Sequence, residues 1–161
     1  MRIAVVSDTH MQAPDDLLAY AYENWLCHAD CIIHCGDFTS AGVADFLAAH
    51  PGFRAVRGNC DHFPGSQDLP LSLEMEVCGL QVGAAHGWGR RFEVAGNVAE
   101  AFGPGLDIIF YGHTHERFQG KSRHGALLVN PGAFFQPKSG SPSLALVEIR
   151  AVPRVDFVDI E

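Results

Sequence analysis

The sequence contains no apolar run of the ~20 residues that a membrane-spanning helix requires. Positive charge is also scarce, because 11 lysines and arginines stand against 19 aspartates and glutamates, for a formal net charge of -8. Nucleic acids and anionic membranes bind basic surfaces, so this balance argues against both as partners. It does not exclude a small phosphorylated ligand that is drawn to a local metal charge.

Repeats, low-complexity tracts and linkers are absent as well, so residues 1–161 are predicted to form a single domain. The stretch MRIAVVSDTH is predicted to be a strand rather than a signal peptide, because its apolar part is too short. The five cysteines are an odd number, which favours reduced thiols. We expect a cytoplasmic protein because neither a signal peptide nor a membrane span is predicted, and reduced thiols are the default there.

Strands and helices alternate over the first sixty residues. Apolar strands are predicted at 2–7, 31–37 and 53–59. A helix whose first turn holds Pro14 and Asp15 separates the first two, and a helix capped by Ser40 separates the last two. This order indicates an α/β fold with a parallel sheet and right-handed crossovers.

The second half of the chain has a different pattern. Residues 71–77 and 80–86 read as a hairpin, and the next helix should bury Phe92, Ala95, Ala99 and Phe102 on one face. Later strands are predicted at 106–111, 126–130, 143–149 and 152–160.

Seven side chains with metal-binding atoms follow predicted strands: Asp8, His10, Asp37, Asn59, His86, His113 and His115. Ligands of open α/β sheets bind at the carboxyl ends of strands, so these side chains should meet at one edge. In an extended chain alternate side chains point the same way, so each D-x-H or H-x-H pair should face one cavity. Seven ligands exceed the four of a tetrahedral zinc site and suit two divalent ions.

The order of these motifs resembles the calcineurin-like metallophosphoesterase superfamily. Its pattern of D-x-H, G-D, G-N-H-D/E, a lone H and G-H-x-H stands here at residues 8–10, 36–37, 58–61, 86 and 112–115. GNCD and the NPGA of residues 130–133 are similar to the small bacterial and archaeal phosphodiesterase branch. The resemblance covers roughly the whole chain, and five motifs in order are more specific than any one.

The resemblance implies two metal sites and a phosphodiesterase activity. Asp8, His10, Asp37 and His115 would hold the first ion. Asp37, Asn59, His86 and His113 would hold the second, with Asp37 bridging. The ions would be manganese first, with iron, zinc, nickel or magnesium as alternatives, and a hydroxide bridging them would attack a small phosphodiester in line.

The chain departs from the family pattern at two positions. Cys60 replaces the histidine assigned to protonating the leaving group, so Cys60 and His62, two residues on, are the candidate acids. We therefore expect a preference for good leaving groups, such as aryl phosphodiesters. Trp88 replaces a second histidine and offers an aromatic rim, so Asn59 and Trp88 are the candidate substrate-binding residues.

Other readings of the same residues are structural. Any one of the seven polar residues at strand ends is explained by capping or loop hydrogen bonds, but seven in family order are not. His34 reads as a hydrogen-bonded core residue. Cys27, Cys31 and Cys35 recur every fourth residue, yet they straddle a helix end and a strand, so we interpret them as buried inert thiols.

The expected fold is a four-layer αββα sandwich, metallo-dependent phosphatase-like, with a mixed first sheet and a largely antiparallel second sheet. Two alternative functions stay open. One is a catalytically weak scaffold on the same fold, and the other is a phosphomonoesterase or nucleotidase. Exposed sheet edges also suggest a homo-oligomer, either a dimer or a tetramer.

Overall fold

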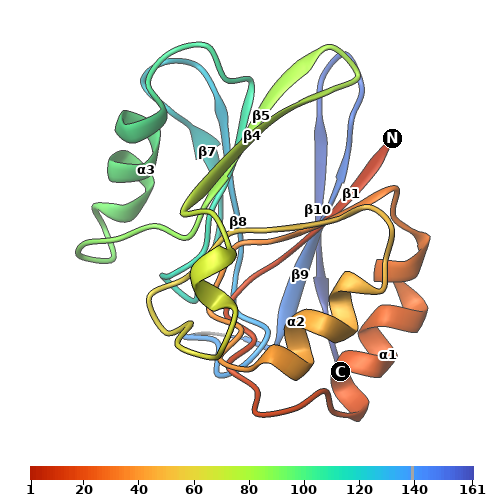
Figure 1. Cartoon of the computed structure of the whole chain (residues 1–161). Coiled ribbons are helices and arrows are strands. Elements are labelled where there is room, and N and C mark those ends of the chain that lie inside the picture. Colours follow the sequence, from red (N-terminus) through yellow and green to blue (C-terminus); the bar gives the residue numbers. More distant parts are fainter. Residues whose placement is uncertain (139) are drawn as a thin grey trace.

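The computed structural model describes residues 1–138 and 140–161. Two five-stranded sheets pack face to face, and helices cover both outer faces (Figure 1). α1 (Asp16–Asn24) and α2 (Ala41–Ala48) lie on one side, and α3 (Val94–Phe102) lies on the other. The predicted αββα sandwich is confirmed.

The first sheet has the strand order β10-β9-β1-β2-β3. Its strands are β1 (Arg2–Val6), β2 (Cys31–His34), β3 (Phe53–Ala55), β9 (Ser143–Glu148) and β10 (Arg154–Asp159). β1, β2 and β3 are parallel, whereas β9 runs antiparallel to both β1 and β10. The sheet is mixed, as predicted.

The second sheet has the order β4-β5-β6-β8-β7 and is also mixed. Its strands are β4 (Ser72–Val77), β5 (Leu80–Ala85), β6 (Ile108–Phe110), β7 (Arg117–Lys121) and β8 (Leu127–Pro131). The central strands β5, β6 and β8 are parallel. The prediction of a largely antiparallel sheet was wrong, because α3 forms a crossover that returns the chain to β6 in the direction of β5.

Two local features differ from the sequence-based expectation. β7 was not predicted, because RFQGK is a polar edge strand without an apolar face. Phe92 was expected on the inner face of the helix, but it precedes α3 and is 79% exposed. The rest of the predicted face is confirmed, because Ala99 is buried against the sheet and Ala95 and Phe102 pack partly against the same core, which Val94 and Val98 complete. Two short 3₁₀ helices complete the elements, at Leu26–His28 and Ser66–Asp68.

β1 shows why the strands were recognisable. Ile3 and Val5 pack between the two sheets, while Ala4 and Val6 pack under the helices of the first sheet. Both faces of the strand are therefore buried, which requires an uninterrupted apolar run.

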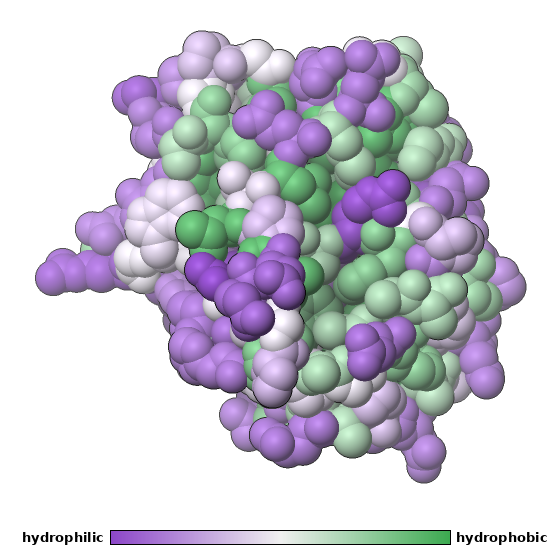
Figure 2. All heavy atoms as spheres, in the orientation of Figure 1, coloured by the Kyte–Doolittle hydropathy of each residue, from purple (hydrophilic) through white to green (hydrophobic). Residues whose placement is uncertain are grey.

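The helices begin at acceptor side chains. Asp15 accepts a hydrogen bond from the Leu18 amide, and Ser40 accepts one from the Val43 amide, as the predicted cap at Ser40 requires. No helix in the described part of the chain is long and apolar enough to cross a membrane. On the face shown in Figure 2, hydrophilic residues are prominent around the rim, and apolar atoms gather nearer the middle.

The fold brings the loops of both sheets together at one end. The Asp8 amide donates to the Gly36 carbonyl at 3.0 Å, which joins the loops after β1 and β2. The His86 ring contacts the Cys35 carbonyl at 2.7 Å, which ties the loop after β5 to the first sheet. Asp8, His10, Asp37 and His86 lie on these loops, and Asn59, His113 and His115 lie on the loops after β3 and β6.

Candidate metal centre

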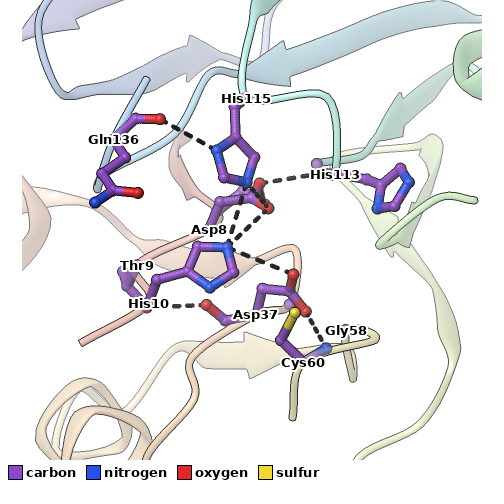
Figure 3. A network of polar contacts seen from close by, with 12 residues as sticks. Asp8, Thr9, His10, Asp37, Gly58, Cys60, His113, His115 and Gln136 are labelled. Carbon is purple, nitrogen blue, oxygen red and sulfur yellow. Dashed lines mark hydrogen bonds and ion pairs between the residues drawn. The ribbon is translucent and has the colours of Figure 1, made fainter. Parts of the chain in front are cut away.

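Three of the predicted ligands, Asp8, His10 and His115, form one group whose ligand atoms lie within 4.8 Å of one another, and Asp37 adjoins it through His10 (Figure 3). His115 Nε2 lies 3.2 Å from Asp8 Oδ1 and 3.3 Å from His10 Nε2. His10 Nε2 lies 3.5 Å from Asp37 Oδ2. Two carboxylates and two imidazoles therefore point their donor atoms at one small volume.

A second group adjoins the first through Asp37. His86 Nε2 lies 3.3 Å from Asp37 Oδ2 and 3.1 Å from Asn59 Oδ1. His113 Nδ1 lies 3.0 Å from Asn59 Oδ1, and its ring points away from His10 and His115 in Figure 3. All seven candidate side chains lie together, and Asp37 lies against members of both groups.

The chemistry of Asp8 fits a bound cation. Its carboxylate is fully buried, and Oδ1 has no hydrogen-bond partner among the described residues. Burial acts to raise its pKa, but His10 and His115 more than offset that effect, so the pKa lies below its usual range. A buried ionised oxygen needs a positive partner, and either a protonated His115, 3.2 Å away, or a divalent ion between these ligands supplies one.

Backbone carbonyls orient two of the imidazoles. His86 Nδ1 lies 2.7 Å from the Cys35 carbonyl, and His115 Nδ1 lies 3.2 Å from the Gln136 carbonyl. A carbonyl only accepts, so each Nδ1 carries the proton and each Nε2 keeps its lone pair for a metal.

The neighbouring carboxylates raise the pKa of both rings. Burial acts to lower the pKa of His86, but its contact with Asp37 outweighs that effect. Asp8 is the main cause for His115. A metal must displace a proton from these rings, so its affinity should fall in acid.

The backbone of the candidate ligands departs from the sequence-based expectation. Asp8, His10, Asp37, His113 and His115 have φ angles of 55°, 45°, 62°, 69° and 58°. These values lie in the left-handed region, which costs a non-glycine residue about 1 kcal/mol or more. The residues of each D-x-H or H-x-H pair therefore lie close together on a left-handed backbone. The prediction that they meet because the chain is extended was wrong.

Two glycines permit the close approach of the loops. A Cβ at Gly112 would lie 1.9 Å from Ser7 Oγ, and a Cβ at Gly58 would lie 2.1 Å from Asp37 Oδ1. Any side chain at either position would displace a candidate ligand or its neighbour.

Asp61 has a structural role that the sequence did not reveal. Its buried carboxylate accepts hydrogen bonds from the amides of Asp37, Phe38, Thr39 and Gly58, at 2.7–3.0 Å. It therefore joins the loop that carries Asp37 to the loop that carries Asn59. Asp61 is the last residue of the GNCD motif, but the motif does not indicate that its carboxylate accepts hydrogen bonds from backbone amides.

Asn130, from the NPGA stretch, holds the loop of His113 and His115. Its Nδ2 donates to the Gly112 carbonyl at 2.8 Å and to Thr114 Oγ1 at 3.1 Å. Its Oδ1 accepts from the Gly132 amide at 2.9 Å. In the sequence, only the similarity of NPGA to the small phosphodiesterase branch indicated that Asn130 has a structural role.

The remaining predictions are mixed. His34 is a buried core residue, as expected, with contacts to Thr9 Oγ1 and the Gly36 amide. Cys31 and Cys35 are buried, but Cys27 is exposed, because it lies in the 3₁₀ helix that follows α1.

Cys60 lies within the cluster. Its sulfur and donor atoms of His10 and Asp37 are all within 4.8 Å of one another. Burial, followed by the charge of Asp37, raises the pKa of its thiol to about 11, so the thiol stays protonated near neutral pH.

His62 and Trp88 lie at the wall of a cavity of about 490 Å³ that Asn59 and His86 also line. His62 is exposed, and Trp88 is 48% exposed. The structure therefore places both candidates beside the second group of ligands.

Two packed mixed sheets with aspartates and histidines gathered at one end are the architecture of a metallophosphoesterase. The model of the calcineurin-like phosphoesterase superfamily domain matches residues 1–151. The chain belongs to the calcineurin-like phosphoesterase superfamily.

Individual relatives agree with this assignment. A probable metallophosphoesterase of Methanocaldococcus jannaschii is 30% identical over 166 residues, covering 100% of this chain and 82% of that protein. The crystal structure of a predicted phosphoesterase from Streptococcus pneumoniae matches with a TM-score of 0.72 and 26% identity, covering 98% of this chain and 88% of the other. Chaetomium thermophilum Vps29 matches with a TM-score of 0.74, covering 98% of this chain and 95% of the other, but at 17% identity it shows the fold alone.

Proposed function

We propose that this protein is a metal-dependent phosphodiesterase that hydrolyses small phosphodiesters. The observation that carries the proposal is the pair of adjoining donor groups, with Asp37 between them, beside an accessible cavity. Carboxylate, imidazole and amide donors at these distances suit two divalent ions of intermediate hardness.

The proposed ligand sets follow the two groups. Asp8, His10, Asp37 and His115 hold one ion, and Asp37, Asn59, His86 and His113 hold the other. Manganese is our first choice, with iron, zinc, nickel or magnesium as alternatives. When bound, such a pair supplies Lewis acidity and an activated water for in-line attack at phosphorus.

The residues of the chain prepare this site electrostatically. Burial acts to raise the pKa of Asp37, but its contact with His86 outweighs burial, so the pKa is lowered and the carboxylate stays ionised. The amide of Cys60 donates to Asp37 Oδ1 at 2.7 Å and fixes that carboxylate. Asp37 would thereby be available as a ligand of both ions.

We expect the site to protonate the leaving group poorly. Cys60 carries a proton near neutral pH, but a thiol is a poor hydrogen-bond donor. His62 is the second candidate, because it lines the cavity beside Asn59. We therefore propose that the enzyme prefers substrates whose leaving group needs little protonation.

The cavity favours a diester over a monoester. Arg57 is the lone arginine or lysine among its lining residues, while Leu71 and Trp88 add apolar surface. A diester carries one negative charge and two organic substituents, which suits such walls better than a dianionic monoester.

The test is a metal add-back assay. The protein is stripped of metal, supplied with manganese, nickel, zinc or magnesium in turn, and assayed on bis(4-nitrophenyl) phosphate and on 4-nitrophenyl phosphate. We expect metal-dependent turnover of the diester, its loss in Asp37→Ala, and no loss in the surface variant His124→Ala.

A folded protein that turns over neither ester with any metal would favour the scaffold alternative. Faster turnover of the monoester would favour the phosphomonoesterase alternative.

A further inference from the structure

The cavity beside the second ligand group extends beyond the metal centre. Asn59 and His86 line it, and so do Arg57, Leu71 and Trp88, which are not among the candidate ligands. A molecule bound at the metals therefore has room for a substituent against the latter three side chains. At about 490 Å³ the cavity is large enough for a small organic group.

Arg57 is half-buried and forms no ion pair among the described residues, because the one carboxylate that also lines the cavity, Asp61, accepts from backbone amides. Most other arginines of the chain pair with a carboxylate: Arg2, Arg91, Arg117, Arg123, Arg150 and Arg154. In a chain of net charge -8, a guanidinium left without a carboxylate at a cavity wall is available for an anion. Its planar fork suits the oxygens of a phosphoryl group.

Trp88 and Leu71 supply the apolar part of the wall. Their side chains are 48% and 66% exposed, so both leave apolar surface accessible to a ligand in the cavity. The Trp88 carbonyl accepts a hydrogen bond from Asn97 Nδ2 at 2.9 Å, so the backbone that carries the indole is tied to α3. An indole and a leucine on one cavity suit a planar aromatic ring.

We propose that Arg57, Leu71 and Trp88 form a subsite that selects phosphoesters with an aromatic substituent, such as an aryl group or a nucleobase. The ring lies against Trp88 and Leu71, and Arg57 binds an oxygen of the phosphoryl group. This inference rests on the proposed function, because the same phosphoryl group must reach the metal centre.

Binding of two non-hydrolysable analogues tests the aromatic part of the subsite. Phenylphosphonate and methylphosphonate share the phosphonate group and differ in the ring. Calorimetry on the manganese-loaded protein should show phenylphosphonate binding about tenfold more tightly.

Variants of the apolar wall assign that preference to the subsite. Trp88→Ala should abolish it without weakening methylphosphonate, Leu71→Ala should reduce it, and Trp88→Phe should keep most of it. Phe92→Ala is the matched control, because Phe92 is exposed but does not line this cavity.

Arg57→Gln tests the anion contact. It should weaken both phosphonates by a similar factor, about tenfold, because both carry the group that Arg57 binds. Arg54→Gln, which removes the same charge from β3 outside the cavity, should change neither affinity.

Two results would overturn the subsite: equal affinities of the wild-type protein for the two phosphonates, including no binding of either, or a preference that survives Trp88→Ala. The measurement is independent of turnover. A ring preference in a protein that hydrolyses nothing would refute the proposed activity and leave the subsite in place. Hydrolysis without a ring preference would refute the subsite and leave the proposed activity in place.

Discussion

At the scale of single residues, five of the seven candidate ligands have a left-handed backbone, a conformation that is costly for residues other than glycine. His113, with φ of 69°, is an example, and its ring contacts Asn59 and His86 at the edge of the centre. Such conformations persist where the surrounding structure enforces them, which is common at active sites.

His113 allows the strain to be measured. His113→Gly and His113→Ala remove the same imidazole, but only glycine tolerates the positive φ. We expect the glycine variant to be more stable than the alanine variant by about 1 kcal/mol in the metal-free state. Urea unfolding in the presence of a chelator measures the difference, and equal stabilities would show that the backbone is not strained.

The second prediction at this scale concerns Cys60 and the dependence of the rate on the leaving group. Because the thiol is a weak proton donor, the rate on aryl phosphodiesters should fall steeply as the pKa of the leaving group rises. Cys60→His should make this dependence shallower, with a gain of about 10- to 100-fold on the poorest leaving groups. A flat dependence in the wild-type enzyme would contradict this account.

The same substrate series separates the two candidate acids. If His62 protonates the leaving group in place of Cys60, His62→Gln will steepen the dependence further. If it does not, the slope will stay unchanged.

At the scale of elements, the loops after β2 and β3 are held together by Asp61. Asp61→Asn places an amide NH₂ against backbone amides that need an acceptor. We expect a loss of about 2–4 kcal/mol of unfolding free energy and weaker metal binding. Denaturant unfolding measures the first effect, with exposed Asp68→Asn as the control. Equal stability of the two variants would refute this role of Asp61.

β2 carries His34, whose pKa burial lowers from 6.5 to about 3. Between these values the unfolded chain binds a proton that the folded chain excludes. The contribution to stability is therefore full above pH 6.5 and is lost as pH falls toward 3.

His34→Gln removes this proton binding. Between pH 6 and 4, the unfolding free energy of metal-free wild type should fall relative to this variant by up to about 1.4 kcal/mol per pH unit. The comparison isolates His34 from His86 and His115, whose raised pKa values act in the opposite sense. A difference that does not change with pH would contradict the buried neutral state of His34.

The elements also show what a sequence reveals of this fold. β1 was predictable because both of its faces are buried, whereas β7 was not, because an exposed edge strand needs no apolar pattern. The candidate ligands could be predicted as a group because each follows a strand. The four amides that meet Asp61 and the positive φ angles depend on contacts between distant loops, which a local pattern does not encode.

At the scale of the whole molecule, two sheets contribute to one centre. β1, β2 and β3 deliver Asp8, His10, Asp37 and Asn59, whereas β5 and β6 deliver the other three histidines. The centre therefore depends on the packing of the sheets against each other. A homo-oligomer stays a prediction, which light scattering can test. The prediction is based on the exposed sheet edges, which the structure places at β3, β4, β7 and β10.

The measurement that tests the proposed dinuclear centre most directly is the number of manganese ions bound per chain. The metal-depleted protein is titrated with manganese, and bound metal is determined by elemental analysis. We predict two ions per wild-type chain and about one in His113→Ala, which lacks a ligand of the second group only. A folded wild-type chain that binds one ion, or none, would contradict the account.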